Sequence, residues 1–148
     1  MLTSTHVGRQ TLTSTQKQPT FYINGHPDKL YTLVMLDHDA PSPNSPWLHM
    51  LYINIPGSAH TTSPNPNQIT SYSAPSPPPK TGRHHYISTL YEQPFPIQGQ
   101  NTIGDWARPH FDIKSFIAKY GLKPIAETSF FVDSAGGGSG PRKRRARL

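Results

Sequence analysis

The sequence predicts a mainly β protein, in the sense of a β-rich α+β fold, and three observations lead to this class. The 148-residue chain contains 17 prolines, and each proline inside a helix costs about 3 kcal/mol. Several runs of β-branched, aromatic and aliphatic residues have the length of strands and end at turn residues. Clear helical spacing occurs in one segment only. We therefore expect a loop-rich architecture built on strands.

Strands are expected near Val7 and over five ranges, which are 21–23, 30–36, 47–55, 86–91 and 128–132. Asn24-Gly25 and the turn that follows it would join the first two of these ranges as a hairpin-like meander. Residues 58–80 are rich in Ser, Thr, Asn and Pro, so an extended loop is expected there. A solvated linker is favoured over a proline-rich ligand for an aromatic groove, because no flanking pattern specifies a partner.

One helix is expected over 111–120, where apolar residues recur at helical spacing and Gly121 follows as a C-cap. Five aromatic residues of the C-terminal third are expected in the core: Phe111, Phe116, Tyr120, Phe130 and Phe131. Residues 135–148 change abruptly to glycine and then to basic residues, and they are expected to be disordered. The predicted organisation is therefore one domain, 1–134, followed by a tail.

The charge of the chain is concentrated in that tail. The net charge is +6, but five of the 14 basic residues lie in the last seven positions, which leaves nine basic against eight acidic residues in the body. The body therefore carries no charge signature of a nucleic-acid binder. The chain has no cysteine, which excludes disulfides and thiolate chemistry. No run of about 20 apolar residues indicates a membrane span, and no signal peptide is recognisable, so a soluble, cytoplasmic protein is expected.

Polar, titratable side chains gather at the ends of three predicted strands. They are Asp37, Asp39, His49, His84, His85 and Tyr86. If the strand ends meet, imidazoles and a phenol converge with carboxylates behind them. A carboxylate behind an imidazole fixes its tautomer and favours the charged form, which suits the binding of a phosphate or a carboxylate.

Other interpretations of these residues compete with anion binding. Paired acids at a strand end more often cap a turn by accepting bonds from backbone amides. Two Asp and three His could also ligate a metal, but their spacing selects none. Nucleophile, zinc and phosphate-loop motifs are missing, and Ser42 fits a turn better than a nucleophile. We therefore expect no enzyme and no cofactor. The remaining histidines, at 6, 26, 60 and 110, are expected at the surface.

Several motifs, in order and spacing from about Val7 to Val132, resemble the phosphatidylethanolamine-binding protein (PEBP) family, which includes Raf kinase inhibitor protein and the plant flowering regulators. They are LTSTQ, Pro19-Thr20, D-x-D-A-P-S from Asp37, a His in the returning strand, G-x-H-x-Y from Gly82 followed by L-Y-x-Q, and spaced Phe, Tyr, Leu, Pro and Ala from Phe111 onward. The resemblance implies a central antiparallel sheet, a second smaller sheet and one or two short peripheral helices. It also implies a small pocket for phosphate-like headgroups, in a domain that is N-terminally shortened.

Carried over residue by residue, the resemblance implies a ligand-binding set of seven positions: Asp37, Asp39, Trp47, His49, Gly82, His84 and Tyr86. The imidazoles and the phenol would donate to the anion, and the carboxylates would orient the imidazoles or meet a headgroup ammonium. The sequence departs from the family pattern at His38, at His85 and in a shorter loop before Trp47.

The leading hypothesis is a non-enzymatic binding protein that receives a phospholipid headgroup or a phosphorylated ligand. The alternative is a signalling regulator that acts through protein contacts, like the kinase-inhibiting or transcription-complex members, with a vestigial pocket. A third hypothesis is a serine carboxypeptidase inhibitor. The basic run Arg142 to Arg147 is expected to direct the protein to the nucleus, to contact acidic membranes or nucleic acid, or to have no role.

Overall fold

A six-stranded sheet forms the centre of the computed structural model, which describes residues 1–58 and 67–136. The strands stand in the spatial order β2-β8-β7-β4-β5-β6, and every pair is antiparallel except β2 with β8. A second, two-stranded sheet pairs β1 with β3. The bounds are β1 Leu2–Ser4, β2 Gly8–Arg9, β3 Phe21–Ile23, β4 Leu30–Asp37, β5 Trp47–Pro56, β6 Gln68–Thr70, β7 Arg83–Gln93 and β8 Lys123–Asp133. The predicted β-rich class, with a large and a small sheet, is confirmed.

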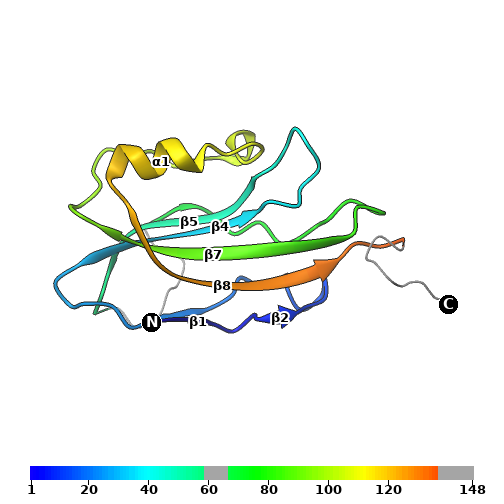
Figure 1. The fold of residues 1–148 in the computed structure, drawn as a ribbon, viewed down its shortest axis with the longest axis horizontal. Helices are drawn as coiled ribbons and strands as arrows, with labels where there is room; N and C mark the ends of the chain where they lie inside the picture. Colours follow the sequence, from blue (N-terminus) through cyan, green and yellow to red (C-terminus); the bar gives the residue numbers. More distant parts are fainter. Residues whose placement is uncertain (59–66, 137–148) are drawn as a thin grey trace.

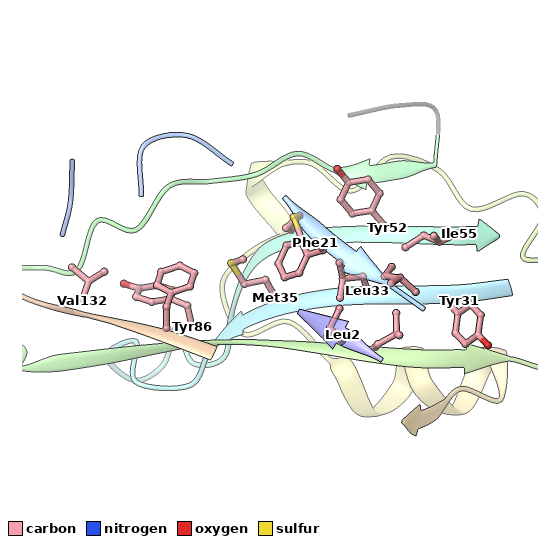
Figure 2. Close-up of a cluster of buried hydrophobic side chains, with 13 residues drawn as sticks. Leu2, Phe21, Tyr31, Leu33, Met35, Tyr52, Ile55, Tyr86 and Val132 are labelled. Atoms are coloured by element: carbon pink, nitrogen blue, oxygen red, sulfur yellow. The ribbon is translucent and has the colours of Figure 1, made fainter. Parts of the chain in front are cut away.

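β4 is the central element because it pairs with β5 on one side and β7 on the other. Its side chains alternate between two apolar clusters. Leu33 and Met35 point into a cluster shared with the small sheet, and Val34 and Leu36 point into a cluster under the helix. Figure 2 shows the first cluster, in which Phe21 of β3 lies near Met35.

The predicted hairpin-like meander between β3 and β4 is wrong. β3 pairs with β1, and both edges of β4 are already occupied by β5 and β7. Phe21 and Ile23 are buried while Tyr22 is exposed, so β3 covers the face of the central sheet instead of extending its edge. The turn at 24–29 therefore carries the chain from one sheet to the other.

The helix α1 (Ile113–Tyr120) lies on the opposite face of the large sheet from β1 (Figure 1). Its N-cap Asp112 accepts a bond of 3.0 Å from the backbone N–H of Ser115, and Gly121 ends it in the left-handed conformation, as predicted. Phe116 and Tyr120 are buried against the sheet. A short 3-10 helix, η1 (Asp105–Ala107), precedes it.

Two expectations along the chain need correction. Phe131 is not a core residue, because Phe130 and Val132 point inward on β8 and the alternation turns Phe131 outward, under the guanidinium of Arg83 at 4.1 Å. The expected loop over 58–80 contains β6, which the sparse apolar residues of this segment did not indicate. Phe111 is half-buried, beside the cluster under α1.

Some expectations concern segments outside the described residues. They include His60 and residues 137–148 of the predicted tail, so the disorder and targeting predicted for that segment stay predictions. Of the other histidines expected at the surface, His26 and His110 are exposed and His6 is half-buried. In the part of the chain that the structure describes, no helix has the length and apolarity needed to cross a membrane.

Replacing Gly121 with alanine is expected to lower the free energy of unfolding by about 1–2 kcal/mol, because an L-residue in the left-handed region carries that cost. The φ of Gly121 is 63°, and a Cβ there would lie 3.2 Å from Cγ of Pro94. Urea denaturation measures the effect. Gly104→Ala, at an ordinary φ of −88°, should change stability by less than about 0.5 kcal/mol, and equal effects of the two variants would contradict the assignment.

Candidate functional site

A cavity of about 210 Å³ lies where β4 ends and where β5 and β7 begin. Two loops close it, one from the turn between β4 and β5 and the other from residues 73–78, which precede β7. Its wall contains five of the seven residues that were predicted to bind a ligand: Asp37, Trp47, His49, His84 and Tyr86.

The strand register explains why these residues meet. Asp37, the last residue of β4, stands opposite Trp47 on β5 and opposite Tyr86 on β7. His49 lies two residues after Trp47, and His84 lies two residues before Tyr86, so the period of two places each pair on one face of the sheet. The convergence predicted from the strand ends is therefore what the antiparallel pairing produces.

Asp37 and His84 form a buried pair at the base of the cavity. The carboxylate Oδ2 of Asp37 lies 2.7 Å from Nδ1 of His84, and Oδ1 accepts a 2.8 Å bond from the backbone N–H of Asp39. Nε2 of His84 lies 2.7 Å from the hydroxyl of Thr81, and that hydroxyl donates to the carbonyl of Pro78 at 2.6 Å. A hydroxyl has one proton, so Thr81 accepts from His84. All these bonds are satisfied when both ring nitrogens of His84 carry a proton.

This bonding changes the role expected of His84. The imidazole was predicted to donate to a bound anion, but both of its nitrogens already have partners inside the protein. The side chain is 1% exposed. His84 therefore braces the cavity wall through its contacts with Asp37 and Thr81.

His49 has one ring nitrogen engaged and one unengaged within the described residues. Its Nδ1 lies 2.6 Å from the backbone carbonyl of Ser73, and its ring packs against Trp47 at 4.7 Å and Tyr86 at 4.9 Å between centroids. Burial lowers the pKa of His49 to about 4, although the bond to Ser73 and the charge of Asp37 act in the other direction. The imidazole is therefore neutral near pH 7.

Tyr86 is another residue of the cavity wall with a polar atom that has no hydrogen-bond partner among the described residues. The residue is 1% exposed, and its ring stacks on Phe130 with a centroid distance of 5.1 Å. None of the described hydrogen bonds involves its phenol oxygen, and its side chain lines the cavity. Burial, followed by the charge of Asp37, raises the pKa of the phenol, which therefore keeps its proton.

Two of the predicted ligand-binding residues, Asp39 and Gly82, do not line the cavity. Asp39 is exposed, and its Oδ2 accepts bonds from the backbone N–H of His85 at 2.8 Å and from the His85 ring at 3.0 Å. Burial acts to raise the pKa of Asp39, but these bonds to His85 outweigh it and the pKa is lowered. Gly82 has a φ of 89° and donates its N–H to Ser134 at 2.9 Å, so it sets the start of β7. Both residues support the site from outside.

Arg108, which the sequence interpretation missed, anchors the wall from behind. Its guanidinium is buried and donates to the carbonyls of Leu48, His49 and Ser71, and to the carboxylate of Asp105 at 2.7 Å. It also lies 5.5 Å from the centroid of the Trp47 ring. Since most of its partners are backbone carbonyls, no side-chain motif distinguishes it from a surface arginine.

The donor set of the described residues contains no group of three or more His, Asp or Glu side chains that could hold a metal ion. The two aspartates and three histidines considered from the sequence instead divide into separate pairs. Asp37 contacts His84, Asp39 contacts His85, and His49 contacts a backbone carbonyl. The cavity wall therefore presents hydrogen-bonding side chains, and the described residues contain no cluster of metal ligands.

Comparison with known proteins assigns the chain to a family. The model of the phosphatidylethanolamine-binding protein family matches residues 3–128. The chain belongs to this family. Its curated relatives include the rice protein MOTHER of FT and TFL1 homolog 2 (Oryza sativa subsp. japonica), which is 35% identical over 108 residues. That match covers 70% of this chain and 60% of the relative, so the PEBP chain spans less than two thirds of the relative's length.

Solved structures agree with the fold. The phosphatidylethanolamine-binding protein from Plasmodium vivax superposes with a TM-score of 0.71 at 18% identity, over 86% of this chain and 78% of that one. A carboxypeptidase Y inhibitor, solved in complex with its cognate proteinase, gives 0.68 at 18% identity over 86% and 76%. At this identity the likeness shows the PEBP fold alone.

His49 is expected to make the protein less stable in acid. Above pH 6.5 the imidazole is neutral in both the folded and the unfolded chain, so it adds no penalty. As the pH falls from 6.5 to about 4, the unfolded chain takes up a proton that the folded chain does not, which costs about 3 kcal/mol. Urea denaturation at pH 7 and pH 4 measures this loss.

The control for this loss is His49→Gln, which cannot titrate and should show an acid loss smaller by about 3 kcal/mol. His26→Gln, at an exposed histidine, should behave like the unmodified protein. If all three proteins lose the same stability between pH 7 and pH 4, His49 is not held neutral by burial.

Arg108→Met is expected to lower the free energy of unfolding by about 3 kcal/mol, because it leaves buried carbonyl oxygens without donors. The matched control is Asp105→Asn. The side chain of Asp105 is 91% exposed, so this variant should lose less than about 1 kcal/mol. Urea denaturation compares the two. A loss of similar size in both variants would show that the ion pair with Asp105, and not the carbonyl bonds, carries the energy.

Proposed function

We propose that this PEBP chain is a non-enzymatic binding protein whose cavity holds a phosphate-type anion. The observation that carries the proposal is the presence of two buried polar atoms without partners among the described residues, Nε2 of His49 and the phenol oxygen of Tyr86. A buried polar atom without a partner costs about 1–3 kcal/mol, and a bound ligand would supply the missing bonds.

The size of the cavity favours a headgroup over a whole lipid. Pockets for drug-sized ligands have volumes of roughly 300–1,000 Å³, and this one has about 210 Å³. A phosphate group with a short substituent fits that space, whether it belongs to a phospholipid headgroup or to a phosphorylated partner. The phenol of Tyr86 would donate to one phosphate oxygen, and the wall of Trp47 and prolines would exclude water from the bond.

A signalling regulator that acts through protein contacts is the second candidate, and Trp106 favours it. This side chain is 89% exposed and belongs to η1, which the buried Arg108 holds against β5. Exposed tryptophans are frequent among residues that dominate protein interfaces. Inhibition of a carboxypeptidase is not proposed, since the resemblance to that inhibitor concerns the fold. The cytoplasmic location and nuclear entry through Arg142 to Arg147 stay predictions.

Titration with phosphorylethanolamine tests the anion site, with binding followed by the NMR signals of the histidine side chains. The His49 signals should shift, and Tyr86→Phe should weaken binding about tenfold, the cost of one hydrogen bond, with little change in stability. Tyr52→Phe is the matched control. The Tyr52 phenol accepts a 2.7 Å bond from Gln18 and does not line the cavity.

Tyr52→Phe should therefore lose about 1 kcal/mol of stability and keep the affinity of the unmodified protein. An unmodified protein whose His49 signals do not move at saturating ligand would overturn the proposed anion site. Equal binding by Tyr86→Phe and the unmodified protein would remove the phenol from it.

A further inference from the structure

Ser76 belongs to the cavity wall and is also open to solvent. It lies in the loop before β7 and lines the cavity together with the prolines that follow it. The residue is exposed, whereas His49 and Tyr86 on the opposite strands are buried. None of the described hydrogen bonds involves the Ser76 hydroxyl. Ser76 therefore stands at the mouth of the cavity, with a hydroxyl that is available for reaction.

The backbone on both sides of Ser76 is irregular and makes few bonds. Residues 71–78 form neither strand nor helix. The prolines of this segment have no N–H to donate, and no described backbone hydrogen bond involves residues 74–77. The segment is anchored at its ends, where the N–H of Ser73 donates to the His49 carbonyl at 2.9 Å and the Thr81 hydroxyl donates to the Pro78 carbonyl at 2.6 Å. Residues 74–77 can therefore enter the cleft of an enzyme without breaking a described backbone hydrogen bond.

The residue after Ser76 is a proline, and this pair is the substrate of proline-directed serine/threonine kinases. Three Ser-Pro pairs lie within the described residues, with serines at 42, 45 and 76. Ser42 is exposed but does not line the cavity, and Ser45 is half-buried with its hydroxyl bonded to the carbonyl of His38 at 2.7 Å. Ser76 is therefore the serine of the three at which a phosphate meets the cavity.

A phosphate on Ser76 changes the charge at the cavity mouth. It carries about −1.5 to −2 charges near pH 7 and brings three acceptor oxygens. Among the described residues no lysine or arginine lines the cavity, and Arg108, behind the wall, donates to the carbonyls of Leu48 and His49. No cationic side chain of the wall offsets the added charge. A second anion is therefore repelled, and the repulsion is stronger where water is excluded.

We infer that Ser76 is a phosphorylation site for a proline-directed serine/threonine kinase, and that its phosphate blocks the cavity to phosphate-type anions. The second part of this inference rests on the proposed function. In the reaction, Oγ of Ser76 forms a bond to the γ-phosphorus of ATP while the bond from that phosphorus to the β,γ-bridging oxygen breaks. The hydroxyl proton passes to the base of the kinase, and ADP leaves.

The first experiment treats the full chain with an active mitogen-activated protein kinase and Mg-ATP, and it maps the phosphate by mass spectrometry. Ser76 should become phosphorylated. Ser45, whose hydroxyl is engaged, should stay unmodified, which shows that the kinase acts on the folded protein. Pro77→Ala should slow the modification of Ser76 about tenfold or more without changing that of Ser42. A folded protein that gains no phosphate on Ser76 would overturn the inference.

The second experiment measures the binding of phosphorylethanolamine by calorimetry, before and after phosphorylation. At pH 7.5, above the second pKa of a phosphoserine near 6, the phosphorylated protein should bind about tenfold more weakly or worse. Ser76→Glu should bind about threefold more weakly, because it adds one charge. Kinase-treated Ser76→Ala should bind as untreated Ser76→Ala does, which excludes effects of phosphates elsewhere.

The matched control for added charge is Ser58→Glu. Ser58 is exposed and follows the end of β5, whereas the cavity lies at the start of that strand. At about 3.3 Å per residue the strand separates the two by about 30 Å. A charge at that distance is screened by salt, so Ser58→Glu should change the affinity by less than about twofold.

The outcomes separate this inference from the proposed function. Equal binding by the phosphorylated and the unmodified protein overturns the block and leaves the anion site standing. Equal weakening in Ser58→Glu and Ser76→Glu also overturns it, because net charge and not the cavity mouth is then responsible. If the unmodified protein does not bind phosphorylethanolamine, the proposed anion site fails and the block fails with it, while the mapping alone decides whether Ser76 is phosphorylated.

Discussion

The pairing of β4 with both of its neighbours is the constraint on which the site depends. A strand that is hydrogen-bonded on both edges and buried on both faces has one register compatible with its apolar pattern, since a slip by one residue would exchange the two clusters. That register places Asp37 opposite Trp47 and Tyr86. The cavity is therefore built on the paired ends of the central strands, and the two loops that close it contribute prolines and short polar side chains.

The parts of the structure that the sequence predicts are those decided by local pattern. β4, β5 and α1 each carry an apolar period and a terminating turn or cap, such as Gly121 at the end of the helix. The pairing of β3 was predicted wrongly because a short strand followed by an Asn-Gly turn has the same local pattern whether it extends the sheet or covers it. β6 was missed for a related reason, since Ile69 and Thr70 become a strand through pairing with Leu51 and its neighbours.

In the candidate site, the residue types could be predicted from the sequence, but the hydrogen bonds that each side chain makes could not. The sequence identifies which imidazoles, carboxylates and phenol converge, because strand ends and period two are local properties. The sequence does not show which histidine ring nitrogen lacks a hydrogen-bond partner among the described residues. The answer depends on the Ser73 carbonyl, which engages His49, and on the Thr81 hydroxyl, which engages His84 and the Pro78 carbonyl. Arg108 likewise holds the wall through three backbone carbonyls. Backbone atoms carry no sequence signature, so the difference in bonding between His49 and His84 is visible only in three dimensions.

These bonds leave a pocket that is polar and yet close to electrically neutral. The carboxylate of Asp37 is paired with the ring of His84, and the charge of Arg108 is shared with Asp105. The body of the chain is itself nearly balanced, with nine basic and eight acidic residues before the tail. Attraction at a distance therefore contributes little to the capture of an anion, because steering requires a net field at the mouth of the site. Recognition of an anion would then depend on hydrogen bonds made at short range by the polar groups that line the cavity.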